Sequence, residues 1–534
     1  MSLTSVGAET SKRRIAIIGG GASGVISLLQ LLHASQSSQT ARVSHKAQTP
    51  TSSLEPSVLV DIFEPKSELS GGLAYTSNDE SLILNVPAAN MGFSPSDVKS
   101  FESWLDQASP EQRTQKNYPY VPRAQFKAYL NSLIETLPKN SWQHLRESVN
   151  SLAFVGGQWE IHTDAGTTAR YDFVIVATGY ISRTDHRPLK MDSAGSSDLI
   201  LDPNQDTLQN IKNESEVAII GSGLSAFDHW RALRSKGFNG KVTMISRHGL
   251  TPMPHHSALA NHATSQHVRL PKLIEMSPIE ILRVLRSLES TGTIGWLQIA
   301  DQVRQQGRAI WSIWSQAERA QFGRHLRYRW EILRHRLPPN VHAEWLAEVE
   351  AGIAVARSGR IIETTQVGNK IRIRMNSGEI EADAVLMATG AKISQNDVKF
   401  EGLMPGVEVC EFGFGYRNTG AANLWFIGPA SKTSFWEITA IPDIRTQVAG
   451  VVSEIHKLML EPKATFFSKF KLHPHQAGCT YQQHFFRSVN ISKFALVRAW
   501  MSAVHAVLPI YYDDRVSSDL RDFAKRVSKF RKIK

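Results

Sequence analysis

The chain reads Arg14-Ile15-Ala16-Ile17-Ile18-Gly19-Gly20-Gly21-Ala22-Ser23-Gly24 near its start, an apolar run followed at once by a glycine-rich turn. An apolar run of this kind predicts a buried parallel strand, and the small residues after it predict a turn that opens a helix. Glycines at this spacing permit the tight turn, the close approach of the backbone to a pyrophosphate and the close packing of helix on strand. The helix N-terminus adds unpaired N–H groups for the phosphate charge. The predicted contacts are Gly19, Gly21, Ala22, Ser23 and Gly24.

A second stretch of the same kind reads Glu216-Val217-Ala218-Ile219-Ile220-Gly221-Ser222-Gly223-Leu224-Ser225-Ala226. Ala226 takes the place of the third glycine, which the pattern allows. One such motif is a weak indication of a nucleotide, whereas two in one chain predict two dinucleotides that exchange electrons. The predicted contacts of the second site are Gly221, Gly223, Leu224, Ser225 and Ala226.

The residues after the next strand distinguish the two predicted cofactors. Val58–Phe63 ends in Glu64, a carboxylate that can accept hydrogen bonds from a ribose diol, which fits FAD. The Ser/Thr/Gln-rich stretch 34–57, interpreted as a flexible insertion, explains why Glu64 lies further from the glycines than usual. At the matching place in the second unit stands Arg247, which can grip a 2′-phosphate and therefore favours NADPH over NADH.

A second internal repeat supports an α/β fold with two Rossmann-like dinucleotide-binding domains, the second inserted into the first. Tyr171-Asp172-Phe173-Val174-Ile175-Val176-Ala177-Thr178-Gly179 is echoed by Ala382-Asp383-Ala384-Val385-Leu386-Met387-Ala388-Thr389-Gly390, and Asn423–Gly428 is a further strand. Thr178, Gly179, Gly390 and Gly428 are therefore expected near the cofactors. We expect an FAD-binding domain in 12–215 and 346–456, an NADPH-binding domain in 216–345 with a helical insertion at 260–340, and a helical, basic C-terminal extension at 457–534.

Composition narrows the class of protein. The 534-residue chain has a net charge of +11, and much of the excess lies in 304–336 and 521–534. Such local patches favour anionic ligands over general nucleic-acid binding. The two cysteines, Cys410 and Cys479, form no disulfide framework or metal-binding spacing, so we expect a cytoplasmic protein without a metal. Packing of the basic tail on the body of the protein is favoured over contact with a membrane surface.

The chain resembles the two-dinucleotide flavoproteins, and more closely a broad, mostly bacterial family of FAD/NAD(P)-binding proteins of poorly defined activity. The resemblance rests on the first glycine stretch and on Gly71–Tyr75, Leu84–Ala88, Pro122–Phe126, Trp330–Arg336 and Trp436–Arg445. It implies that FAD lies on the first domain, with Gly72, Asn85, Val86 and Arg123 among its contacts. Pro429 stands where many relatives have an aspartate, so that one contact does not carry over.

The leading hypothesis is a flavin-dependent monooxygenase that uses NADPH, dioxygen and a small-molecule substrate, such as an amine or amino acid, through a C4a-hydroperoxyflavin. The catalytic candidates are His255, Trp436 and Glu437. Arg324, Arg327, Arg334 and Arg336 form either a solvated helix face or a site for a substrate carboxylate or a cofactor phosphate. A reductase that passes electrons to a partner or quinone, and a non-catalytic FAD-binding protein, remain alternatives. The Phe-x-Gly-x-x-x-His signature of Baeyer–Villiger enzymes is absent before the second glycine stretch.

Overall fold

The computed structural model describes residues 12–43, 58–108, 119–179, 200–201, 211–213, 215–255, 270–292, 295–390, 399–401, 407–409, 416–418 and 420–460. Among these, two five-stranded sheets organise the chain, and every pair of neighbouring strands in them is parallel. The mixed α/β class predicted from the sequence is therefore confirmed.

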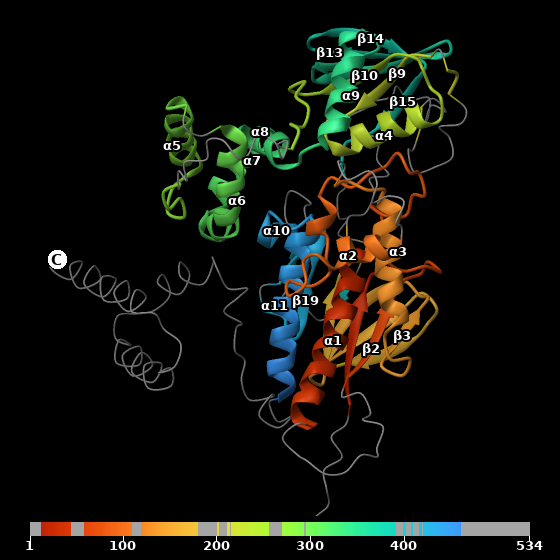
Figure 1. Ribbon diagram of the computed structural model, residues 1–534, viewed down its shortest axis with the longest axis vertical. Helices are drawn as coiled ribbons and strands as arrows, with labels where there is room; N and C mark the ends of the chain where they lie inside the picture. The colour runs from red at the N-terminus through yellow and green to blue at the C-terminus, as the bar shows by residue number, and fades with distance from the viewer. Residues whose placement is uncertain are drawn as a thin grey trace, which may run out of the picture. The chain divides into compact units, whose positions relative to one another are not determined.

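The first sheet has the order β19-β7-β1-β2-β3. The first glycine stretch follows its central strand, β1, and apolar side chains bury both faces of that strand. Ile15 and Ile17 belong to a core shared with the helices, while Ala16 and Ile18 belong to the core on the opposite face. Figure 1 shows α1 between α11 and α3 on the helical side of this sheet. The bounds are β1 Arg13–Ile18, β2 Val58–Phe63, β3 Trp142–Leu145, β7 Phe173–Val176, β19 Leu424–Phe426, α1 Ala22–Val43, α2 Ser100–Ala108, α3 Arg123–Glu135 and α11 Ile441–Leu460.

The second sheet repeats this arrangement with the order β11-β10-β9-β15-β8. Its central strand, β9, precedes the second glycine stretch, and the next strand along the chain, β10, lies beside it just as β2 lies beside β1. All strands of this sheet fall, in sequence, between β7 and β19 of the first sheet. The bounds are β8 Ile200–Leu201, β9 Val217–Ile220, β10 Val242–Ser246, β11 Ala354–Ser358, β15 Ala384–Met387, α4 Leu224–Ser235 and α9 Pro339–Glu350.

Smaller sheets and a group of helices complete the described part. The first sheet is accompanied by β4 Val149–Val155, β5 Gln158–Thr163, β6 Thr168–Tyr171 and β16 Lys399–Glu401, and β17 Val407–Val409 pairs with β18 Tyr416–Asn418. An antiparallel sheet of β12 Ile361–Val367, β13 Lys370–Met375 and β14 Gly378–Ala382 follows β11. The helical insertion comprises α5 Pro278–Ser290, α6 Trp296–Ile313, α7 Gln316–His325 and α8 Arg327–Arg334. The short helical segments are η1 Ala88–Asn90, η5 Gly428–Ser431 and α10 Lys432–Phe435.

Strand pairing assigns segments on both sides of the predicted domain boundaries to the second sheet. β11 pairs with β10 and β15 pairs with β9, so the chain stays with the second sheet well past the predicted return at residue 346. β8 also pairs with β15, although residues 200–201 were assigned to the first domain. The sequence signal was too weak here because β11 is short and carries Arg357 and Ser358 at its exposed end.

Two further segments differ from expectation. The stretch 34–57 is not a loop throughout, because α1 continues to Val43; its remainder, 44–57, lies outside the described residues. α11 runs to Leu460, past the predicted boundary at 457, and the rest of the C-terminal extension lies outside the described residues. None of the described helices is long and apolar enough to cross a membrane.

Candidate active site

The first glycine turn is packed so tightly that side chains are excluded from it. Gly19 has a φ of +104°, and a Cβ there would lie 2.6 Å from the carbonyl oxygen of Ala177. A Cβ on Gly24 would lie 1.9 Å from the carbonyl oxygen of Gly19. The end of β1, the turn and the first turn of α1 therefore meet backbone to backbone. Thr178 and Gly179 follow Ala177 directly, at the carboxyl end of the adjacent strand β7.

Three other predicted FAD contacts gather at this turn. The carboxylate of Glu64 accepts a hydrogen bond from the Gly20 N–H at 3.0 Å. The Gly72 Cα lies 3.3 Å from the position of a Cβ on Gly21, and a Cβ on Gly428 would lie 2.4 Å from the hydroxyl oxygen of Ser23. These contacts form a narrow cradle at the N-terminus of α1, where small residues leave room for a pyrophosphate.

The second glycine turn has the same geometry at its start and more open space at its helix. Gly221 has a φ of +126°, and a Cβ there would lie 2.2 Å from the carbonyl oxygen of Ala388, which stands two residues before Gly390. Gly223 precedes α4, and a Cβ on it would meet no atom within 4 Å. Leu224 and Ser225 open α4, and Ala226 is fully buried against the strand. The turn thus presents a helix N-terminus to open space.

A cationic corner lies beyond β10, beside this second turn. Arg247 is exposed there, and the ring of His248 stacks on that of Tyr328 with the centroids 3.7 Å apart. Loss of solvent contact, together with the charges of Arg247 and Arg329, lowers the pKa of His248. The helical insertion therefore brings Tyr328 and Arg329 to the strand end that carries Arg247. The sequence did not indicate either residue, because the contact between His248 and Tyr328 is set by the fold.

His255 lies at the loop predicted to face the flavin. Its Nε2–H donates to the carbonyl oxygen of Asn85 at 2.8 Å, and its ring lies 5.4 Å from that of Tyr120. Burial, the largest cause, lowers the pKa of His255. A neutral imidazole that donates through Nε2 fixes the Asn85–Val86 backbone, so His255 acts on this loop as a positioning group.

Arg123 fixes the same loop from its other side. Its guanidinium donates to the carbonyl oxygen of Ile83 at 3.1 Å and to the carboxylate of Asp228, on α4, at 2.8 Å. The Leu84 N–H donates to Val121 and the Arg123 N–H donates to Leu82, which closes the loop against the start of α3. Arg123 thus links the loop that carries Asn85 to the helix that opens at the second glycine turn.

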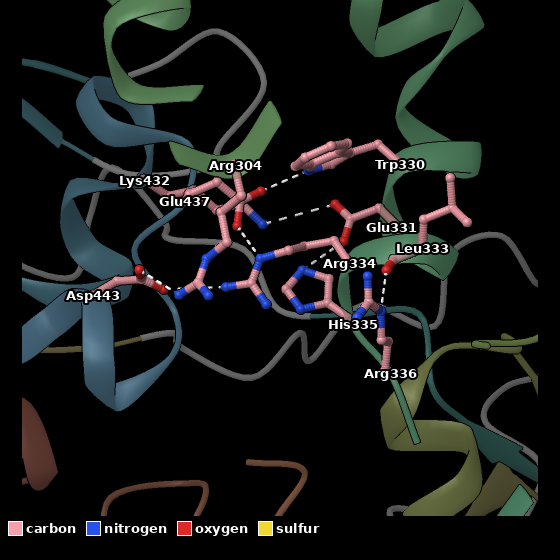
Figure 2. A network of polar contacts seen from close by, with 10 residues as sticks. All are labelled: Arg304, Trp330, Glu331, Leu333, Arg334, His335, Arg336, Lys432, Glu437 and Asp443. Atoms are coloured by element: carbon pink, nitrogen blue, oxygen red, sulfur yellow. Dashed lines mark hydrogen bonds and ion pairs between the residues drawn. The ribbon is translucent and has the colours of Figure 1, made fainter. Parts of the chain in front are cut away.

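Glu437 is buried in an ion-pair network, shown in Figure 2. It accepts a hydrogen bond from the indole N–H of Trp330 at 2.6 Å and one from Arg334 at 2.7 Å. Asp443, at the start of α11, accepts from Arg304 at 2.6 Å and from Arg334 at 3.1 Å. The network joins α6 and α8 of the helical insertion to the segment that precedes α11. Charged groups with this many partners are held in place, so Glu437 is a fixed part of this network.

The predicted arginine face is divided among different partners. Arg334 belongs to the network of Glu437, while Arg336 is buried and bonds Asp301 at 3.0 Å and the carbonyl oxygen of Leu297 at 2.7 Å. Arg327 pairs with Glu331 at 3.3 Å, and Arg324 is exposed. The four arginines therefore do not form one face: ion pairs inside the protein hold Arg334 and Arg336, whereas Arg327 is partly exposed and Arg324 is exposed.

Trp436 forms part of the core of the helical insertion. It has a φ of 48° and stacks on Trp311 with the ring centroids 4.6 Å apart. Phe322 contacts it edge-on at 5.1 Å, and Lys432 lies over its ring at 5.3 Å. Trp436 thus anchors the segment after η5 to α6 and α7. This packing gives it a role that needs no contact with a cofactor.

Comparison with known proteins supports the two-cofactor interpretation. Residues 16–181 match the family described as FAD-NAD(P)-binding. The match shows that this segment resembles an FAD-NAD(P)-binding domain. The resemblance predicted from the sequence to FAD/NAD(P)-binding oxidoreductases is confirmed, and the domain contains the first glycine turn together with Glu64, Gly72, Asn85 and Arg123. Residues 468–530 match a second family, of unknown function, and no curated protein matches the sequence.

Solved structures of flavin-dependent monooxygenases share the fold. The ornithine hydroxylase from Pseudomonas aeruginosa is 15% identical with a TM-score of 0.55, and the alignment covers 84% of this chain and 100% of that one. The ornithine N-hydroxylase from Kutzneria, solved with reduced FAD, NADP⁺ and L-ornithine, is 14% identical with a TM-score of 0.53 over 84% and 99%. The FAD-bound cadaverine monooxygenase from Erwinia amylovora is 10% identical with a TM-score of 0.53 over 86% and 97%.

Proposed function

We propose that the protein is an FAD- and NADPH-dependent oxidoreductase that acts as a monooxygenase on a small molecule. The observation that carries this proposal is the repeated site geometry. Four strands follow the same order in the two parallel sheets, β3-β2-β1-β7 in the first and β11-β10-β9-β15 in the second, and the central strand of each leads into a glycine turn that opens a helix. Dinucleotides bind at the carboxyl ends of such strands, where the strand order reverses. Two such sites in one chain suit hydride transfer from one dinucleotide to another.

The proposal assigns FAD to the first turn and NADPH to the second. Glu64 lies at the first turn and can accept hydrogen bonds from the ribose diol. Arg247 and Arg329 lie at the strand end beside the second turn, and their charges suit a 2′-phosphate. Bound flavin would supply the redox chemistry, taking a hydride from NADPH and passing electrons to dioxygen. The chain's own residues hold the geometry: His255 and Arg123 fix the loop at Asn85 and Val86 from two sides.

The shared fold favours a monooxygenase over other flavoproteins. The structures with TM-scores of 0.53 to 0.55 above hydroxylate ornithine or cadaverine according to their descriptions, and one holds both FAD and NADP⁺. A substrate of this protein would enter beside the loop of Asn85, because that is where the two sites meet through His255 and Asp228.

The test follows NADPH oxidation by the purified, flavin-bound protein in air and under argon. A monooxygenase should reduce its flavin with NADPH in both atmospheres and consume dioxygen only in air, with oxygen uptake rising when a substrate is added. Electron flow only to an added quinone, without oxygen uptake, would contradict the proposal. So would a folded protein that binds no FAD.

A further inference from the structure

The helical insertion contains a cavity that the cofactor sites leave unassigned. Its volume is about 350 Å³, and its walls come from α5, α6, α7 and α8, with Met253 and Trp436 added to the lining from outside the insertion. Protein interiors leave few voids larger than a water molecule. Pockets for small organic ligands have volumes of roughly 300–1,000 Å³. A space of this size among four helices is therefore suited to a ligand.

The cavity is lined almost entirely by hydrocarbon and aromatic surface. Ile281, Leu285, Ile299 and Val303 face it from α5 and α6, together with the rings of Trp311, Trp314 and Trp330. The polar atoms of two of these rings are bonded outside it: the Trp314 indole N–H donates to Met276 at 2.9 Å and that of Trp330 donates to Glu437 at 2.6 Å. The lining therefore offers contact area with few groups that could hydrogen-bond a polar ligand.

The few charges at the cavity select against amines. Arg286 and Arg329 are the charged residues of its described lining, and no acidic residue belongs to that lining. A substrate ammonium group needs a carboxylate or several carbonyl oxygens to replace its water, and two arginines would repel it. A neutral or anionic molecule meets no such cost.

The walls of the cavity are fixed by polar contacts on their outer sides. α5 and α7 each begin with a capping box, at Ser277 and Ser315. Gln302 and Gln306 of α6 accept from the N–H groups of Leu270 and Leu273, both at 2.9 Å. A cavity whose frame is held in this way is preformed, so a ligand would not need to order the helices when it binds.

Two lining residues, Met253 and Trp436, lie on chain segments that lead to the cofactor sites. Met253 lies two residues before His255, which bonds the loop of Asn85, and the Met253 N–H donates to Ile332 at 3.0 Å. Trp436 follows the segment that starts at Gly428, which lies against Ser23 of the first glycine turn. The cavity is thus built on chain segments that lead directly from both predicted cofactor sites.

We propose that this cavity binds the substrate, and that the substrate is an apolar organic molecule, neutral or anionic, instead of an amine or amino acid. The inference that the ligand is a substrate rests on the proposed function, whereas binding in the cavity does not depend on turnover. The ligand would lie among the tryptophans of α6 and α8, with any carboxylate at Arg286.

The test measures binding of a fluorescent apolar probe, N-phenyl-1-naphthylamine, to the full-length, flavin-bound protein. We expect saturable binding to one site, accompanied by a change in tryptophan fluorescence, and displacement by decanoate but not by L-ornithine or cadaverine. Displacement by ornithine at concentrations where decanoate has no effect would overturn the proposal. So would the absence of saturable binding.

Two cavity-filling variants and a matched control locate the probe. Ala300→Phe fills the cavity from α6, Leu282→Trp fills it from the less buried α5 wall, and Gln305→Phe adds the same ring on the exposed side of α6. Either filling variant that keeps its FAD should bind the probe at least about tenfold more weakly, while Gln305→Phe should bind it normally. Unchanged binding in both filling variants would overturn the proposal. Probe binding without any oxygen consumption would support the cavity as a binding site and contradict the proposed monooxygenase activity.

Discussion

At the scale of single residues, Arg247 and Arg334 show that an arginine side chain can either stabilise the protein or be available to bind a ligand. Arg334 is 12% exposed and bonds two carboxylates, Glu437 and Asp443. Arg247 is exposed at the end of β10 and has no ion pair within the described part of the chain. An arginine held by two carboxylates stabilises the protein, whereas one that projects beside a helix N-terminus can bind a ligand.

Arg247→Ala should weaken NADPH binding by roughly tenfold to a hundredfold, which is the loss expected for a hydrogen-bonded charge pair of about 1.5–3 kcal/mol. NADH lacks the 2′-phosphate, so its binding should change little. The dependence of the flavin reduction rate on the concentration of each coenzyme measures both affinities. Arg324→Ala, at an exposed arginine of α7, is the matched control. Equal losses of affinity for NADPH and NADH would show that Arg247 does not bind the 2′-phosphate.

His255 gives the protein a pH-dependent contribution to stability. Burial lowers the pKa of this imidazole in the folded protein, so the unfolded chain, with a pKa near 6.5, binds the proton more readily. The contribution is therefore fully present above about pH 6.5 and is lost as the pH falls below it, by at most about 1.4 kcal/mol per pH unit. His255→Gln keeps an N–H donor for Asn85 but does not titrate. Urea unfolding between pH 7.5 and 5 should show a shallower loss in the variant, and parallel curves would contradict this role.

At the scale of elements, the network around Glu437 fastens the helical insertion to the start of α11. Breaking a buried ion pair leaves an uncompensated charge and costs about 3–5 kcal/mol, so Glu437→Ala should destabilise the protein by roughly that amount. Glu344→Ala is the control, because Glu344 is 50% exposed in its pair with Arg231, and it should cost less than about 1 kcal/mol. Urea unfolding measures both. If Glu437→Ala kept its stability but its flavin reduction rate fell by orders of magnitude, Glu437 would instead be a catalytic residue.

The elements also show which features a sequence can predict. Glycine turns and apolar strands depend on neighbouring residues, so β1, β9, α1 and α4 could be predicted from their own segments. The network and the cavity form where α6, α8 and the segment before α11 pack together. The sequence around Glu437 and Trp436 does not indicate this packing. For the same reason β11 was missed: it gains its place from pairing with β10, not from a strong strand pattern of its own.

At the scale of the whole molecule, the two sheets repeat one design with separate sites. In each, a glycine with positive φ at the central strand abuts a carbonyl oxygen of the strand beside it, Ala177 in the first and Ala388 in the second. The packing that shapes one turn does not include the other. Damage to the second turn should therefore spare the first cofactor.

Gly223→Ala and Gly221→Ala test this independence. A Cβ on Gly223 meets no atom within 4 Å, so Gly223→Ala should fold, keep its FAD and lose NADPH affinity, because the methyl group would occupy space that a pyrophosphate needs. A Cβ on Gly221 would lie 2.2 Å from Ala388 at a φ of +126°, so Gly221→Ala should lower the thermal midpoint as well. Flavin content, the thermal midpoint and NADPH-driven flavin reduction distinguish the two. If Gly223→Ala lost its flavin while remaining folded, the two turns would be coupled, and if it reduced its flavin normally, NADPH would not bind at this turn.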